Sequence, residues 1–307
     1  ARFDITADKL TPTELMSALL KSPVDLIWNG GIGTYVKSSD ENHSDVGDKA
    51  NDVLRVNGTD LRCKVFGEGG NLGMTQLGRI EFCLNGGGCN TDFIDNAAGV
   101  DCSDHEVNIK ILLDGVVSDG DMTPKQRNAL LEKMTDTVSD LVLSNNYKQT
   151  QAISLAEQQA STRVGEYRRF INHMVDSGRL DRALEFLPED DQIVERQQQG
   201  KSLSRPELSV LISYAKVQLK ESLADETLTN DPYMAKAVEC AFPPVLRAKY
   251  SDKIYNHRLR KEIVATQVAN DMINHMGINF SHRLVESTGA SAIDVAMAYV
   301  TARDIYQ

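Results

Sequence analysis

The sequence predicts an α/β fold followed by a mainly α region, in which a partial doubly wound parallel sheet precedes C-terminal helices. Glycine clusters and short apolar runs are concentrated in residues 1 to about 102. From residue 103 onward the chain consists of long amphipathic stretches with few glycines, which is typical of helices. The length of 307 residues corresponds to roughly two domains at about 150 residues per domain. We place the boundary near residue 115, which leaves residues 116–307 as a helical domain.

The first part has the local signals of alternating strands and helices. Thr11, Pro12 and Glu14 form the pattern of a capping box at the start of a helix, and Pro23 ends that helix. Strands that alternate with helices form βα units on a parallel sheet. Short apolar segments predict strands at residues 24–28, 61–66 and around Phe93–Ile94, and a second helix is expected at about 46–56.

Each predicted strand ends in a loop rich in glycine or asparagine, at residues 30–33, 67–71 and 95–99. Ligands of parallel sheets bind outside the carboxyl ends of the strands, so we expect these loops to share one rim. Gly30 and Gly31 are therefore candidate cofactor contacts. Neither glycine cluster has the GxGxxG pattern that opens a helix, which leaves tight turns with positive φ as the alternative.

The second part is predicted to be helical throughout. Ser103 and Glu106 have the spacing of a capping box for a helix that continues through Leu113. Ser103, Asp104 and His105 are not a nucleophilic triad, because triad residues converge from distant segments. Further helices are expected at about 124–144, 150–175, 205–222, 232–241, 257–276 and 291–304.

Composition excludes several classes of protein. Hydrophobic residues make up 41% and charged residues 25%, as in globular proteins. The net charge of −11 argues against a nucleic-acid partner or an anionic membrane partner, which would favour a basic patch. No apolar stretch reaches the ~18 residues of a membrane helix. The five cysteines include no CxxC pair, so we expect reduced thiols in the cytoplasm and no metal site.

Several long motifs resemble one family, the large NAD-specific glutamate dehydrogenases of bacteria. The resemblance rests on DLIWNGGIGTYVK, LRCKVFGEGGNLGMTQLGRIEF, NTDFIDNAAGVDCSDHEVNIKILL, NYKQTQAISL, SLSRPELSVLISYAK and HRLRKEIVATQVAN, and it covers nearly the whole chain. It implies oxidative deamination of L-glutamate to 2-oxoglutarate and ammonia with NAD. Residues 1–115 would be the C-terminal part of a dinucleotide-binding, Rossmann-like domain. The family's enzymes are much longer than this chain, which would be their C-terminal portion.

The resemblance extends to motifs of the smaller glutamate dehydrogenases and implies roles for single residues. Asn71 would contact the nicotinamide-side ribose, and Asn96 would hydrogen-bond the carboxamide. Val100 and Ser103 would line the pocket for the distal carboxylate of glutamate. The sequence departs from the pattern at Ala98, which replaces a glycine, at Asp104-His105, which replaces an aromatic pair, and after Asn71, where no proline follows.

The resemblance also implies that the catalytic lysine and aspartate, and the first phosphate-binding loop, lie upstream of this chain. We therefore expect no catalytic residue within the chain and no activity from it alone. The full-length enzyme would be a cytoplasmic homo-oligomer. Two alternatives stay open: a non-catalytic helical module for oligomerisation or regulation, and a different NAD-linked amino-acid dehydrogenase that shares the same rim.

Overall fold

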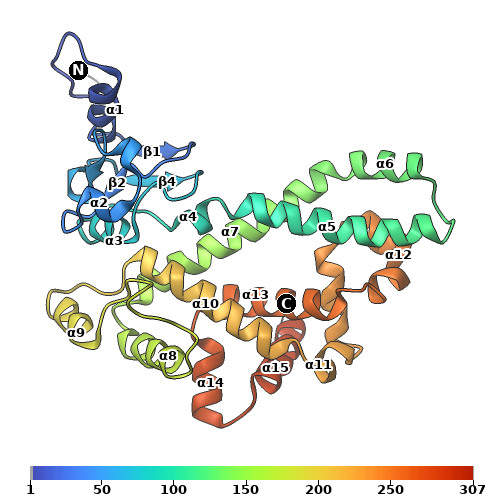
Figure 1. Ribbon diagram of the computed structural model, residues 1–307. Helices are drawn as coiled ribbons and strands as arrows, with labels where there is room; N and C mark the ends of the chain where they lie inside the picture. Colours follow the sequence, from blue (N-terminus) through green and yellow to red (C-terminus); the bar gives the residue numbers. More distant parts are fainter. Residues whose placement is uncertain (1–2, 307) are drawn as a thin grey trace. The chain divides into compact units, whose positions relative to one another are not determined.

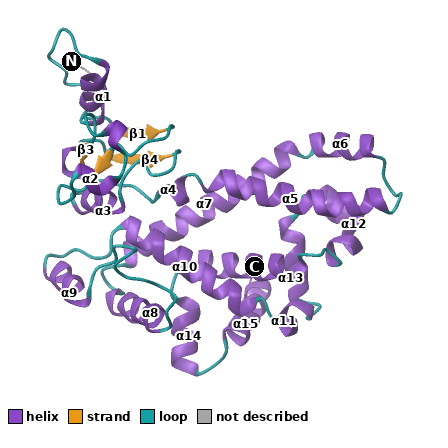
Figure 2. Ribbon diagram, viewed as in Figure 1, coloured by secondary structure: helices purple, strands orange, loops and turns teal. Residues whose placement is uncertain are grey.

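The computed structural model describes residues 3–306. Strands occur near the N-terminus and helices make up most of the remaining chain, as Figures 1 and 2 show, so the predicted order of an α/β part followed by helices is confirmed. Contacts divide the chain into two compact units, each made of two stretches. Unit 1 comprises Ala1–Ala97 and Ile153–Leu211, and unit 2 comprises Ala98–Ala152 and Ile212–Gln307.

The sheet of unit 1 is short and parallel. Strand β1 (Leu26–Asn29) pairs with β4 (Val65–Glu68), with Asn29 opposite Glu68 at the carboxyl ends. On the other side of β4, the Phe66 N–H donates to the Gly88 carbonyl (2.9 Å), and the Gly88 N–H donates to the Lys64 carbonyl (2.9 Å). A separate parallel pair consists of β2 (Val36–Lys37) and β3 (Val56–Asn57).

The predicted strand around Phe93–Ile94 is wrong. These residues belong to the one-turn helix α4 (Asp92–Asp95). The segment around Gly88 takes the place beside β4 instead, and Gly88 itself has no side chain that would indicate a strand. The predicted loop at 95–99 therefore follows the helix α4 and not a strand. Because α4 begins soon after Gly88, the third segment of the sheet, the loop still lies close in sequence to a segment of the sheet.

The helices of the N-terminal stretch agree only in part with the prediction. Helix α1 (Pro12–Leu20) has the expected capping box, in which the Thr11 N–H donates to Glu14 (2.8 Å) and the Glu14 N–H donates to Thr11 (3.3 Å). The prediction of a helix at 46–56 is wrong. Helix α2 (His43–Val46) stops at its C-cap Gly47, which has a left-handed conformation with a φ of 74°. A 3₁₀ turn η1 (Lys49–Asn51) leads on to β3, and a second, η2 (Gly58–Asp60), follows β3. Helix α3 (Gln76–Leu84) was not predicted.

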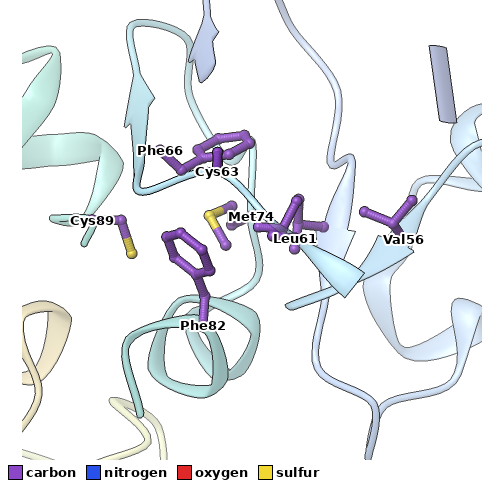
Figure 3. Packing of buried hydrophobic residues seen from close by; sticks show 8 residues of the cluster. Val56, Leu61, Cys63, Phe66, Met74, Phe82 and Cys89 are labelled. Carbon is purple, nitrogen blue, oxygen red and sulfur yellow. The ribbon is translucent and has the colours of Figure 1, made fainter. Parts of the chain in front are cut away.

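The core of the N-terminal stretch lies between the strands and α3. Figure 3 shows Phe82 of α3 pointing toward Met74 and Phe66. The opposite side of β1 is less protected, since Leu26 is 54% and Trp28 58% exposed. The buried cluster consists of Val36, Val56, Leu61, Cys63, Phe66, Met74, Phe82 and Cys89.

Helices form the rest of both units. The helix expected at 124–144 is two helices, because α6 (Pro124–Lys133) ends before Met134 and α7 (Thr135–Gln159) begins after it. The helix expected at 150–175 is likewise the end of α7 followed by α8. The elements are α5 (Ala97–Ser118), α6 (Pro124–Lys133), α7 (Thr135–Gln159), α8 (Val164–Asp176), α9 (Asp190–Gln198), α10 (Arg205–Leu223), α11 (Glu226–Asn230), the 3₁₀ segment η3 (Met234–Ala241), α12 (Pro244–Tyr255), α13 (Arg260–Met276), α14 (Phe280–Thr288) and α15 (Ala292–Tyr306).

Helix α13 contributes seven buried residues to unit 2. It packs against η3, α11 and α15 with side chains that include the fully buried Val264, Ala265 and Met272. Among residues 3–306, no helix combines the length and the continuous apolar character needed to cross a bilayer.

Two helical glycines give a matched test of this packing. A Cβ on Gly78 would lie 2.9 Å from the backbone carbonyl carbon of Lys37, whereas a Cβ on Gly115 would have no atom within 4 Å. We expect Gly78→Ala to lower the free energy of unfolding by about 1–3 kcal/mol through overpacking. Gly115→Ala should raise it by up to about 1 kcal/mol through helix propensity. Denaturant unfolding measures both, and equal shifts in the two variants would contradict the close contact at Gly78.

Candidate functional site

The carboxyl ends of β1 and β4 bring two predicted loops together at one edge of the sheet, which we call the rim. The Gly70 N–H donates to the Asn29 carbonyl (3.0 Å). A Cβ on Gly70 would lie 2.1 Å from the carbonyl oxygen of Gly31, so only glycine permits this approach. Gly30 and Gly31 are exposed there, and neither has a positive φ, so the alternative of a left-handed turn does not apply to them.

Asn71 and Asn96 meet directly at the rim. Nδ2 of Asn96 donates to Oδ1 of Asn71 (2.5 Å), although the two residues are separated by 25 positions in sequence. Asn71 is exposed, and Asn96 is half-buried at the end of α4, where its N–H donates to the Asp92 carbonyl (2.8 Å). Within residues 3–306, Nδ2 of Asn71 and Oδ1 of Asn96 have no hydrogen-bond partner. The NH2 group of Asn71 and the carbonyl oxygen of Asn96 are therefore available to a ligand.

A buried ion network holds the loop that carries Asn71. Glu68 is fully buried, and Arg79 of α3 donates to both of its carboxylate oxygens (2.7 and 2.9 Å). The same guanidinium lies 3.2 Å from Asp92, which accepts from the Leu72 N–H (2.8 Å). Glu68 also accepts from the Met74 N–H (3.0 Å). Burial raises the pKa of the Glu68 carboxyl, and the hydrogen bonds from Arg79 oppose that shift.

Asp95 fixes the other side of the rim. Its carboxylate accepts from the Glu68 N–H (2.9 Å) and from Nδ2 of Asn90 (2.7 Å). Oδ1 of Asn90 in turn accepts from Nε of Arg205 (2.6 Å), which connects the start of α10 to the rim within unit 1. Burial raises the pKa of Asp95. These ionic contacts were not predicted from the sequence, because nothing in it pairs Glu68 with Arg79 or places Asp92 and Asp95 beside them.

Trp28 covers one face of the sheet beside the rim. A Cβ on Gly67 or on Gly69 would lie 2.4 or 2.7 Å from atoms of its indole ring, so both glycines make room for the ring. Trp28, Gly30 and Gly31 contribute to a mainly apolar groove of about 420 Å³, together with Met16 and Leu19 of α1.

Val100 and Ser103 lie on the first two turns of α5 and are exposed. They are three residues apart, which places them on the same side of the helix. The expected capping box at Ser103 is wrong, because α5 already begins at Ala97 and Ser103 lies inside it. His105 is buried and its Nδ1 lies 2.9 Å from the Ala241 carbonyl, so it supports the helix packing of unit 2.

The chain also holds a lysine with an unusual pKa. In unit 2, Nζ of Lys216 donates to Oε1 of Gln149 (2.7 Å). Burial lowers the pKa of Lys216 to about 7.

Among residues 3–306, no group of three or more His, Cys, Asp or Glu side chains could hold a metal ion.

Comparison with family models identifies the chain. A model described as "Bacterial NAD-glutamate dehydrogenase, catalytic domain" matches residues 1–156, just over half of the 307. The chain belongs to this bacterial NAD-glutamate dehydrogenase family. A second model, "Glutamate dehydrogenase, C-terminal", matches residues 200–307. The rim and the first turns of α5 lie within the stretch matched to the glutamate dehydrogenase catalytic domain.

Curated relatives agree with this assignment. The NAD-specific glutamate dehydrogenase of Pseudomonas aeruginosa is 65% identical over 306 residues, which is 100% of this chain and 19% of the relative. That of Halomonas elongata is 58% identical over 305 residues, 99% of this chain and 19% of the relative. That of Mycobacterium tuberculosis is 43% identical over 300 residues, which is 98% of this chain and 18% of the relative. The chain thus spans about a fifth of the length of these glutamate dehydrogenases.

The buried ion network at the rim of this family member can be tested against an exposed ion pair. Arg79→Met leaves Glu68 charged and buried without its partner, which should cost about 3–5 kcal/mol of unfolding free energy. The control is Lys64→Met, which breaks a pair of similar length (2.7 Å) in which both side chains are at least 80% exposed. That variant should unfold almost like the parent protein. Similar losses in both variants, measured by denaturant unfolding, would contradict the structural role of the network.

Proposed function

We propose that this chain forms the nicotinamide side of the NAD site in a glutamate dehydrogenase that converts L-glutamate to 2-oxoglutarate and ammonia. The observation that carries the proposal is the Asn71–Asn96 pair at the carboxyl ends of parallel strands. A carboxamide has an acceptor oxygen and an NH2 group that donates, and the free NH2 of Asn71 and free carbonyl oxygen of Asn96 complement them. Family membership supports the same cofactor.

The residues present fit a bound dinucleotide. Gly30 and Gly31 are exposed at the rim and carry no side chain, which lets a ligand approach the backbone closely. Bound NAD would accept the hydride from the substrate carbon. The chain's own contribution is orientation: two amides fixed by Asp92, Asp95 and Arg79 hold the ring in a single position. Such positioning places the reacting atoms for transfer.

Two residues of α5 are proposed to contact the substrate glutamate. The Ser103 hydroxyl can donate a hydrogen bond to its distal carboxylate, and Val100 offers apolar contact to its methylene carbons. Both are exposed on one side of the helix and therefore available to a ligand. Their position just after the rim residues in sequence supports this role.

We also infer that residues 1–115 are the C-terminal part of a Rossmann-like dinucleotide-binding domain and residues 116–307 a helical domain. The parallel order of β1, β4 and the Gly88 segment supports the first part. For the whole enzyme we propose a cytoplasmic homo-oligomer, as the family resemblance implies.

The cofactor role is tested by Asn96→Ala in the full-length enzyme. Loss of one or two amide hydrogen bonds, each worth about 0.5–1.5 kcal/mol, should weaken NAD binding modestly. Misorientation of the ring should lower kcat further, by about tenfold or more. The control is Asn85→Ala, which removes an exposed amide that caps α3. An unchanged kcat with a lower melting temperature would mean that Asn96 is only a structural residue.

The substrate role is tested by Ser103→Asp. The new carboxylate would repel the distal carboxylate of glutamate, so kcat/KM for glutamate should fall by at least about tenfold. Melting should change little, because Ser103 is exposed within a helix. Ser139→Asp makes the same change at another exposed helical serine, in α7, and should leave the kinetics unchanged. If Ser103→Asp is kinetically normal, the substrate assignment is wrong.

A further inference from the structure

A second cavity lies wholly within unit 2 and has an excess of positive charge. It measures about 400 Å³, which is within the range of small-molecule sites. Its walls come from α7, η3, α12, α13 and α15. None of its lining residues is among those proposed for NAD or glutamate. The charged side chains that line it are Lys148, Lys236, Arg247, Asp271, Arg303 and Asp304.

The two carboxylates of this cavity are already paired. Asp271 accepts from Nη1 of Arg303 (2.6 Å) and from the Tyr299 hydroxyl (2.9 Å). Asp304 accepts from Nε of Arg303 (2.7 Å) and from the Tyr233 hydroxyl. The hydrogen bond from Tyr233 lowers the pKa of Asp304, so this carboxylate is ionised at neutral pH. Arg303 therefore offsets part of the negative charge and is held in place by both acids.

The remaining cations have no such partners. Arg247 of α12 is half-buried, and its Nε is shielded from solvent without any hydrogen-bond partner. Within residues 3–306, no carboxylate forms an ion pair with Arg247, Lys148 or Lys236; the Lys236 ammonium lies over the Tyr233 ring (5.1 Å). A guanidinium nitrogen withdrawn from water without a hydrogen bond is unfavourable, and an oxyanion satisfies it through two parallel bonds, one from Nε and one from a terminal nitrogen.

We propose that this cavity binds a small organic anion through a carboxylate or phosphate group, with Arg247 as the principal contact and the two lysines adding charge. The fit extends beyond charge, because Leu141, Met234, Val268 and Val300 give the cavity an apolar wall for a carbon skeleton. A planar guanidinium matches the geometry of both oxyanions, so the geometry favours this ligand class over an uncharged one. The site does not depend on the proposal for NAD.

The test is calorimetric titration of the full-length protein, saturated with NAD, with inorganic phosphate in one arm and malonate in the other at constant ionic strength. We expect the parent protein to bind at least one of the two, and the arm that binds identifies the anionic group. Arg247→Gln should weaken that binding by at least about tenfold. The control is Arg258→Gln, which removes the same charge from an exposed arginine that does not line the cavity.

A second readout separates binding from folding. Without added anion, Arg247→Gln should melt at or above the temperature of the parent, because it removes an unpaired cation. The bound anion should raise the melting temperature of the parent and of Arg258→Gln, but not that of Arg247→Gln. The proposal is overturned if neither anion binds the parent protein. It is also overturned if Arg247→Gln binds like the parent, or if Arg258→Gln loses as much affinity as Arg247→Gln.

Discussion

The burial of Glu68 is the constraint on which the rim depends. A carboxylate that is fully withdrawn from water must be matched by donors, and Arg79 with the Met74 N–H supplies them. Because Arg79 also pairs with Asp92, the same guanidinium ties α3, the end of β4 and the start of α4 together. The loop with Asn71 and the turn with Asn96 are thereby held at a fixed separation, which lets their amides form a hydrogen bond.

Local signals explain the parts of the fold that the sequence predicted. The capping box at Thr11 and Glu14 acts within one turn, so α1 could be expected from four residues. The pairing of β1 with β4 follows from two apolar runs that each end in glycine, and the shared rim follows from parallel strand order. The meeting of Asn71 with Asn96 was foreseen only as a shared location, because the loops at 67–71 and 95–99 were expected on one rim.

Other parts depend on contacts between distant residues, which sequence patterns do not reveal. Phe93 and Ile94 look like a strand, but α4 buries Ile94 and leaves Phe93 44% exposed, while Gly88 joins the sheet without any side chain. Helices between residues 153 and 211 belong to the same unit as the strands, where Arg205 contacts Asn90. The unpartnered Arg247 is equally invisible in sequence, because an arginine without a partner differs from a paired one only in three dimensions.

The position of Trp28 has a spectroscopic consequence. It is the single tryptophan of this chain, and its ring lies on Gly67 and Gly69 next to the proposed nicotinamide position. Indole emission from this chain therefore originates at the rim alone, without background from the helical parts. Reduced nicotinamide absorbs light where indole emits, so occupancy of the rim by the reduced cofactor would quench this emission by energy transfer. The fluorescence of Trp28 would therefore report binding of the reduced cofactor at its proposed site.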